Sequence, residues 1–158
     1  MKTILIIFFV TINLTGCAKH NYRSPVFDEQ QIQKEVLGSF ESLKTASKNL
    51  DLDGYLQLIN PDKFSGLNVD GINWNNYEEF KQSVTPGFTL IKEIHSLEFP
   101  NVEVIVIDAN TAILVNEYIQ KFTLTNGKTL TSIGGGTQVW SKASGRWLLV
   151  SISASLKN

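Results

Sequence analysis

Apolar residues recur at helical spacing in the segment that follows residue 27. Ile32, Val36 and Phe40 stand four residues apart on one stripe, just after a sequence at Asp28 that resembles a helix-capping box. This pattern predicts a long amphipathic helix over residues 28–49.

Two shorter helices are predicted after it. The first begins at Asp51 or Asp53 and ends before Pro61, because the residue that precedes a proline avoids the α conformation. The second is capped by Asn76 and closes at Pro86-Gly87. The chain between these helices is rich in turn-forming residues and is expected to be irregular.

Beyond Phe88 the period of the apolar residues changes to two, and β-branched and aromatic residues dominate. Asn126-Gly127 is the strongest hairpin signal, because a type I′ turn needs positive φ at both central positions. The three glycines at 134–136 fall inside a strand, where they weaken pairing but permit a bulge or a sharp bend. Strands are predicted at 90–99, 101–107, 112–123, 129–141 and 146–155.

Helices followed by a meander of strands predict an α+β domain, in which three helices pack into a strongly curved, mainly antiparallel sheet. The sequences Asn110-Thr-Ala-Ile113, Gly136-Thr-Gln-Val-Trp140 and Gly145-Arg-Trp-Leu-Leu-Val150 look like the SnoaL-like branch of the nuclear transport factor 2-like superfamily. The resemblance runs from about Gln30 to Ser155. It implies a cone-shaped domain whose sheet and helices enclose a pocket open at one end.

The amino terminus has the three parts of a secretory signal. Lys2 supplies a positive charge, Thr3 to Leu14 is almost wholly apolar, and small residues precede the sole cysteine, Cys17. An apolar run of about a dozen residues is too short to cross a bilayer, which takes about 20. Leu14-Thr15-Gly16-Cys17 resembles the bacterial lipobox, which implies cleavage before Cys17 and lipidation of its thiol.

These features predict a lipid-anchored protein of the cell envelope. Residues 1–16 are the expected signal peptide, residues 17–27 the lipidated cysteine and a polar tether, and residues 28–158 the domain. By resemblance to lipoproteins of two-membrane bacteria, Ala18 in place of an aspartate implies the outer membrane, facing the periplasm, if the host is Gram-negative.

The composition limits which partners and cofactors are expected for this chain. With 14 Lys+Arg against 15 Asp+Glu, the chain has no basic excess to neutralise a nucleic acid backbone, so no nucleic acid partner is expected. One cysteine and 2 histidines leave little for a metal centre, and neither a metal nor a cofactor is predicted.

The resemblance also directs attention to groups that could move protons. Enzymes of the superfamily often place His or Asp on the pocket side of the last strands, where this chain has Ser151 and Ser153. A serine without a neighbouring base is neither a general base nor an activated nucleophile. Glu117 is the candidate acid or base if its face of strand 112–123 lines the pocket, because desolvation would then raise its pKa. If that face is solvated, Glu117 pairs with a lysine such as Lys121.

Aromatic residues in the short helices and their connections predict an apolar pocket wall, although the same residues could fill a core. The leading hypothesis is binding of a small apolar ligand or a protein partner without catalysis, with a homodimer through the outer face of the sheet as one partner. The alternative is an isomerase-, hydratase- or cyclase-like enzyme on a hydrophobic substrate that uses Glu117. A structural envelope protein with a filled interior is a third hypothesis. The candidate pocket residues are Tyr55, Phe64, Trp74, Phe80, Phe88, Tyr118, Ser151 and Ser153.

Overall fold

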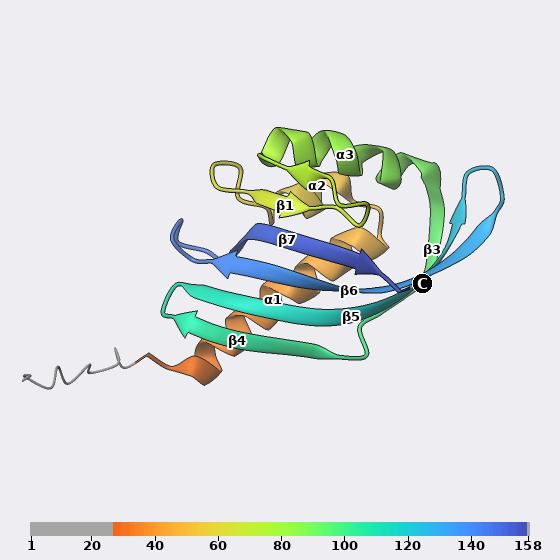
Figure 1. The fold of residues 1–158 in the computed structure, drawn as a ribbon. Helices are drawn as coiled ribbons and strands as arrows, with labels where there is room; N and C mark the ends of the chain where they lie inside the picture. Colours follow the sequence, from red (N-terminus) through yellow and green to blue (C-terminus); the bar gives the residue numbers. More distant parts are fainter. Residues whose placement is uncertain (1–26, 158) are drawn as a thin grey trace, which may run out of the picture.

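The computed structural model describes residues 27–157, and this part of the chain contains three α-helices and seven β-strands (Figure 1). The predicted signal peptide, the lipidation site at Cys17 and almost all of the tether lie outside the described residues. No helix within residues 27–157 has both the length and the apolar character that a bilayer crossing requires.

Helix α1 (Glu29–Lys48) confirms the predicted amphipathic helix. Asp28 caps it, because its Oδ1 accepts a hydrogen bond from the backbone N–H of Gln31 at 3.0 Å. Helix α2 (Leu52–Leu56) is shorter than predicted, and the side chain of Asp51 caps its first turn. The buried residues of α1 are Ile32, Val36, Phe40, Leu43 and Ala46.

Helix α3 (Tyr77–Leu90) runs further than expected, so the prediction that Pro86-Gly87 closes it is wrong. A proline inside a helix leaves one carbonyl of the preceding turn without its usual donor. Here the proline and Gln82 are both exposed, so water can hydrogen-bond to that carbonyl. The last turn is held by Phe88, whose ring centroid lies 5.3 Å from that of Tyr55.

The five strands predicted from the alternating pattern are all present, with ends displaced by a few residues at most. Two further strands lie in the turn-rich chain before α3, which was expected to be irregular. The strands are β1 (Ser65–Leu67), β2 (Asn73–Trp74), β3 (Ile91–Glu98), β4 (Val102–Asp108), β5 (Thr111–Leu124), β6 (Thr129–Ser141) and β7 (Leu148–Leu156).

All seven strands belong to one open sheet, in the order β2-β1-β7-β6-β5-β3. One edge of β5 pairs with β6 along its length, whereas the other edge is shared by β4 near its beginning and β3 near its end. Every pairing is antiparallel except that of β1 with β7. The expected α+β class with a curved, mainly antiparallel sheet is therefore confirmed.

The hairpin between β5 and β6 forms at Asn126-Gly127 as predicted, but its turn is of another type. Only Gly127 has positive φ, at 85°. Its backbone N–H donates to the carbonyl of Leu124 at 2.9 Å, and the N–H of Leu124 donates to the carbonyl of Lys128 at 2.9 Å. This pattern fits a type I turn followed by a left-handed glycine, so the predicted type I′ turn is wrong.

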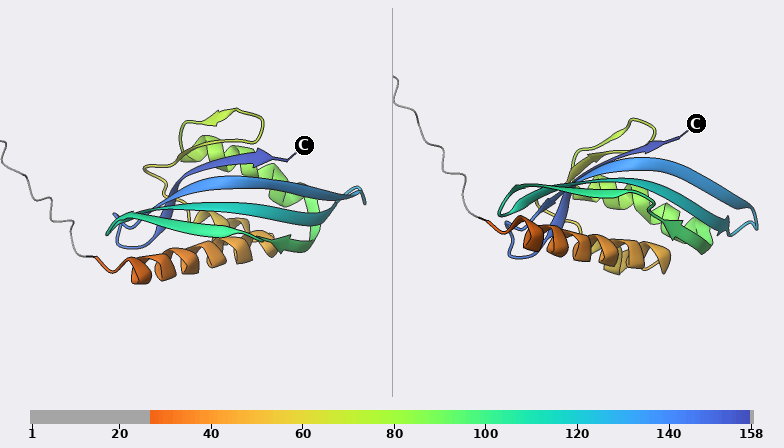
Figure 2. Two further views of the ribbon diagram at one scale, coloured as in Figure 1. Left: turned by 60° about the horizontal axis from the view of Figure 1, so that its bottom comes forward. Right: turned by 90° about the horizontal axis from the view of Figure 1, so that it is seen from below.

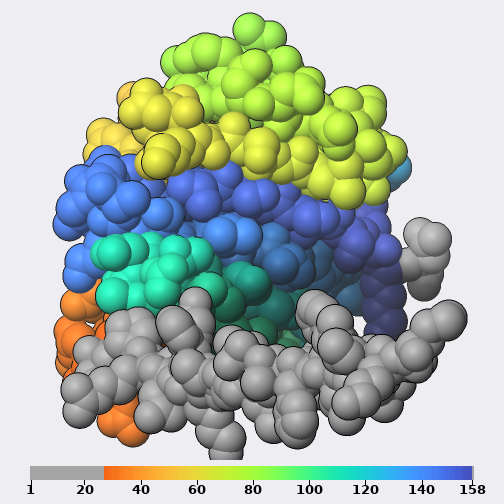
Figure 3. Space-filling view, turned by 60° about the vertical axis from the view of Figure 1, so that its left-hand side comes forward, coloured from red at the N-terminus to blue at the C-terminus, as the bar shows by residue number. Residues whose placement is uncertain are grey.

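The domain has two layers. The sheet arches over α1 and α3, and among the described residues no helix covers its convex face (Figure 2). Seen from one end, α3 and the chain before it stack above the band of strands formed by β7, β6 and β5 (Figure 3). The large side chains that are fully buried in the core are Val36, Phe40, Ile59, Phe80, Leu114, Trp140 and Leu149.

Candidate functional site

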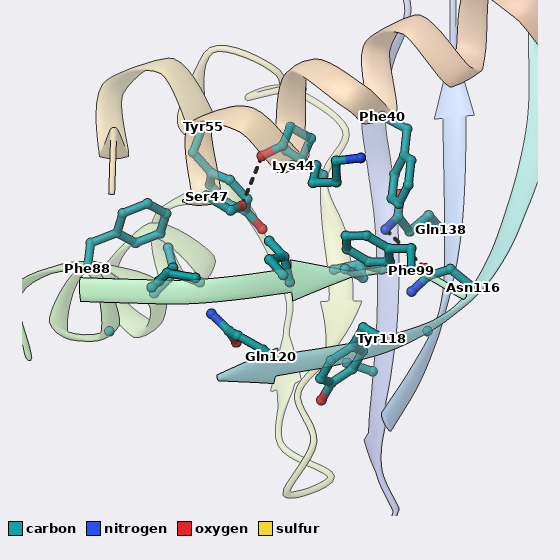
Figure 4. Close-up of a pocket in the computed structure, with 18 of the residues that line it drawn as sticks. Phe40, Lys44, Ser47, Tyr55, Phe88, Phe99, Asn116, Tyr118, Gln120 and Gln138 are labelled. Atoms are coloured by element: carbon teal, nitrogen blue, oxygen red, sulfur yellow. Dashed lines mark hydrogen bonds between the residues drawn. The ribbon is translucent and has the colours of Figure 1, made fainter. Parts of the chain in front are cut away.

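A cavity of about 390 Å³ lies between the concave face of the sheet and the helices (Figure 4). Strands β3, β5, β6 and β7 contribute to it, as do all three helices. Most of the surface that it presents is apolar. The apolar side chains that line it are Phe40, Leu43, Leu50, Val84, Phe88, Ile91, Ile94, Leu97, Phe99, Ile152 and Ala154.

The sheet supplies the polar part of the cavity wall. Because side chains alternate along a strand, Asn116, Tyr118 and Gln120 of β5 all face the cavity, and Gln138 joins them from β6. The helices add Lys44 and a few hydroxyl groups. The site is therefore an apolar chamber with amide groups on one wall, which is the usual character of a small-molecule site.

Two of the amide side chains on this wall are linked to a buried indole. Trp140 donates its Nε1–H to Oε1 of Gln138 at 3.0 Å, and Nε2 of Gln138 lies 3.4 Å from Oδ1 of Asn116. Trp140 is fully buried, whereas Gln138 and Asn116 keep 4% and 6% of their surface exposed. The two amides are thus held in place by the core beneath them.

Glycine at position 136 leaves the cavity wall open beside Asn116. The two residues are direct cross-strand partners, and Gly136 has no side chain to fill the space above the pair. Gly134, two residues earlier, permits a close approach, because a Cβ there would collide with the carbonyl oxygen of Ser155 and the ring of Tyr118. Of the bulge or bend that the glycines permit, no bulge forms there, since the register with β7 shifts only between Val139 and Trp140.

Tyr55 contributes a phenol from α2. Its ring centroid lies 5.3 Å from that of Phe88 and 6.2 Å from that of Phe80. Burial among these rings raises the pKa of Tyr55 to about 12. The phenol therefore keeps its proton at neutral pH and can offer a ligand only a hydrogen bond.

Lys44 is the one residue with a formally charged side chain among the residues that line the cavity in the described part of the chain. Its Nζ donates to Oε1 of Glu41 at 2.8 Å, one turn earlier on α1. The ammonium group is thus already paired at the helix surface, and no carboxylate or histidine lines the cavity within residues 27–157.

Three of the predicted pocket residues do line the cavity, namely Tyr55, Phe88 and Tyr118. The other three aromatic candidates form a buried cluster in the core instead, with Phe80 at its centre. The ring centroids of Phe64 and Trp74 lie 4.4 Å and 5.1 Å from that of Phe80. They support the cavity wall and do not contact its interior.

The two predicted serines lie away from the cavity. Ser151 and Ser153 pair with Ser65 and Leu67 of β1, and they line a shallow surface depression beside that strand. Ile152, between them, is the residue of this segment that lines the cavity. The polar side chains that the sheet presents to the cavity therefore come from β5 and β6 and do not include these serines.

Glu117 is exposed on the convex face of the sheet, because its neighbours Asn116 and Tyr118 face inward. Its Oε2 accepts a hydrogen bond from Nδ2 of Asn101, and its backbone N–H donates to the carbonyl of Asn101 at 3.0 Å. Glu117 therefore lies on a solvated face, which was one of its two predicted positions, but its partner is Asn101 and not Lys121. Glu117 is thus outside the cavity and cannot serve a reaction there.

Sequence reasoning missed the three amide residues of the wall, Asn116, Gln120 and Gln138. The sequence did contain one signal for two of them: Asn116 and Gln120 alternate with Tyr118 along one face of the same strand. The opposite face of this strand is also partly polar. Apolar residues on that other face, such as Ile113, drew attention away from them.

Solved structures share this fold. A nuclear transport factor 2-like protein of Salmonella enterica serovar Typhimurium is 16% identical and superposes with a TM-score of 0.73, covering 83% of this chain and 94% of that chain. A candidate dehydratase of the same superfamily from Streptomyces avermitilis is 15% identical, with a TM-score of 0.73 and coverage of 82% and 99%. The CaMKII association domain of C. elegans is 21% identical, with a TM-score of 0.65 and coverage of 80% and 97%.

At these identities the likeness establishes the fold, which is that of the nuclear transport factor 2-like proteins. The sequence model of the SnoaL-like domain matches residues 36–157, and the chain therefore belongs to the SnoaL-like domain family. No protein with a curated description matches the sequence.

Proposed function

We propose that this domain is a receptor that binds a small apolar molecule in its cavity and performs no chemistry on it. The observation that carries the proposal is the cavity itself, which has about 390 Å³ of space and predominantly apolar walls. A domain that served only as a structural envelope protein would have no need of such a space, and filling it would gain packing contacts.

The side chains around the cavity argue against the enzyme alternative. An isomerase or dehydratase needs a group that accepts a proton near neutral pH. Burial raises the pKa of Tyr55 to about 12, Lys44 is paired with Glu41, and the carboxylate of Glu117 lies on the other face of the sheet. One fold neighbour is described as a candidate dehydratase, but at 15% identity it supports only the shared fold.

We place the domain at the surface of a membrane of the cell envelope, held by lipid on Cys17. The support is the lipobox-like sequence before Cys17 and the polar stretch that separates it from Glu29, where α1 begins. In a Gram-negative host we assign it to the outer membrane, facing the periplasm. The variant Cys17→Ser tests this placement, because it should move the protein from the membrane fraction to the soluble fraction or stall its processing; unchanged fractionation contradicts lipidation.

A second copy of the chain is the partner that the convex face of the sheet favours. Three of its aliphatic side chains, Ile105, Val115 and Ile133, are 44%, 40% and 43% exposed. The fold neighbour from C. elegans is described as an association domain, which supports self-association as a use of this fold.

Native mass spectrometry tests the proposed function and the partner together. The protein is purified gently from its host after delipidation and sprayed without denaturation. We expect a mass adduct of one small molecule per subunit that is lost on denaturation, and a dimer peak at higher concentration. A ligand-free monomer from its own host would count heavily against both proposals.

A further inference from the structure

Asn116 carries an amide nitrogen that no other group of the described residues uses. Asn116 lines the cavity and keeps 6% of its surface exposed. Its Oδ1 faces Gln138, whereas Nδ2 has no hydrogen-bond partner among residues 27–157. Figure 4 shows the amide of Asn116 between Phe99 and Tyr118, with the nitrogen turned toward the side on which Tyr118 and Gln120 lie.

The chemistry of Trp140 fixes this orientation. An indole N–H can only donate, so the atom of Gln138 that faces it must be the amide oxygen. Nε2 of Gln138 then faces Asn116 and donates a hydrogen bond, so the atom of Asn116 that accepts it must be the amide oxygen. Each amide is thereby locked in one of its two orientations, and Asn116 presents N–H donors to the cavity.

The surroundings leave these donors accessible to a ligand. Gly136 lies directly opposite Asn116 on the neighbouring strand and has no side chain to cover the amide. Apart from the neighbouring amide side chains, the wall includes Phe40 and Phe99, which pack edge to face at a centroid distance of 4.8 Å. A buried donor in such a place rejects a ligand that leaves it unpaired.

We infer that the cavity selects apolar molecules that carry a carbonyl-type oxygen, and that this oxygen accepts a hydrogen bond from Nδ2 of Asn116. The inference rests on the proposed function and adds the class of ligand to it. A hydrocarbon of the same shape fills the same space but leaves the amide unpaired. A group that can only donate meets another donor and is excluded for the same reason.

The ketone 9-fluorenone and the hydrocarbon fluorene form a matched pair of probes, since they share one tricyclic skeleton and differ in C=O against CH₂. A cavity without a placed donor prefers fluorene, because the carbonyl loses its hydration on entry. We expect wild-type protein to bind fluorenone about tenfold or more tightly than fluorene in calorimetric titrations, which corresponds to about 1.4 kcal/mol.

Three variants locate the effect. Asn116→Leu should lose the preference for the ketone over fluorene, whereas Asn101→Leu, a change of the same kind at an exposed asparagine, should keep both the preference and the affinity for fluorene. Gln138→Leu removes the group that orients the Asn116 amide, so this amide can rotate by 180°. We therefore expect a smaller preference for the ketone even though Asn116 itself is unchanged. This variant replaces Asn116→Leu in the test if Asn116→Leu fails to fold.

The outcomes separate the two levels of the proposal. Equal affinity of wild-type protein for both probes, or a ketone preference that survives both Asn116→Leu and Gln138→Leu, overturns the inference and leaves the proposed function standing. Binding of neither probe by folded wild-type protein overturns both.

Discussion

Trp147 donates its indole N–H to Oε2 of Glu35 at 2.8 Å and so joins the turn before β7 to the first half of α1. Lys142 donates to the same oxygen at 2.6 Å, and Gln31 donates to the other oxygen at 3.0 Å. One carboxylate thus collects three donors, two of which come from the hairpin that connects β6 and β7. This cluster fixes the helix beneath the sheet at the end of the domain away from the cavity residues of β5.

The first prediction concerns the acid stability that this cluster confers. The hydrogen bond from Lys142, followed by those from Gln31 and Trp147, lowers the pKa of Glu35 from 4.5 to about 2. A depressed pKa in the folded state means that the stabilisation is complete above pH 4.5 and is lost as the pH falls toward 2. We expect Glu35→Gln to lower the free energy of unfolding in urea at pH 7, and the gap to wild type to close as the pH approaches 2.

The matched control is Glu41→Gln on the same helix. Glu41 pairs with Lys44 at an exposed position, where an ion pair contributes roughly 0–1 kcal/mol. A gap between wild type and Glu35→Gln that stays constant from pH 7 to pH 2 would contradict this account.

The second prediction concerns Tyr55. Burial raises its pKa from 10.0 to about 12, so the folded state favours the neutral phenol. This contribution to stability is complete below pH 10 and is lost as the pH rises through 12. In an alkaline absorbance titration we expect the wild type to show a late phenol ionisation that Tyr55→Phe lacks. A difference between the two curves that is already complete below pH 11 would show that the phenol is not buried as described.

Much of the fold could be predicted because helix and strand periods are local properties of the sequence. The stripe of Ile32, Val36 and Phe40 defines α1 wherever the helix packs, and the long alternating runs define the strands. The strands β1 and β2 have 3 and 2 residues, too few to show a period. They exist because β7 and α3 hold that segment in place, which is a tertiary effect.

The site was harder to predict because the cavity reverses the usual pattern. In β5 the polar Asn116 and Gln120 face inward, whereas the apolar Val115 faces outward, so counting apolar residues selects the wrong face. In β7 the alternation itself breaks. Leu149 pairs with Trp140 on the inner face, but Ser151 pairs with Val139 on the outer one. A one-residue irregularity of this kind moves every later side chain to the opposite face.

The third prediction tests the close approach at the glycines of β6. A Cβ at Gly134 would collide with a backbone carbonyl, so we expect Gly134→Ala to lower the free energy of unfolding by about 1–3 kcal/mol. Gly38, on the exposed side of α1, has nothing within 4 Å of an added Cβ, and Gly38→Ala should raise stability by roughly 0.5–1 kcal/mol. Urea unfolding of both variants measures the difference. A change of the same size and sign in both would mean that the approach of β7 to Gly134 does not limit this position.

The fourth prediction concerns self-association through the convex face. Val115 lies on that face and is 40% exposed, so a lysine there should oppose pairing of two such faces. Sedimentation equilibrium should show a concentration-dependent dimer for wild type and a monomer for Val115→Lys. Ile72→Lys serves as the control, because Ile72 is 63% exposed in the turn between β1 and β2 and away from this face. Equal masses for wild type and Val115→Lys at every concentration would contradict the proposed interface.

Binding of a neutral fluorescent probe tests the receptor function most directly. We would titrate the neutral fluorescent ketone 6-propionyl-2-(dimethylamino)naphthalene into wild type, into Ala154→Leu, which adds bulk inside the cavity, and into Ser155→Leu, which places the same side chain on the exposed face of β7. We predict saturable binding of one probe per subunit in wild type and in Ser155→Leu, and an affinity at least about tenfold lower in Ala154→Leu, equivalent to about 1.4 kcal/mol. Equal binding by all three proteins would place the probe elsewhere and contradict a binding function for this cavity.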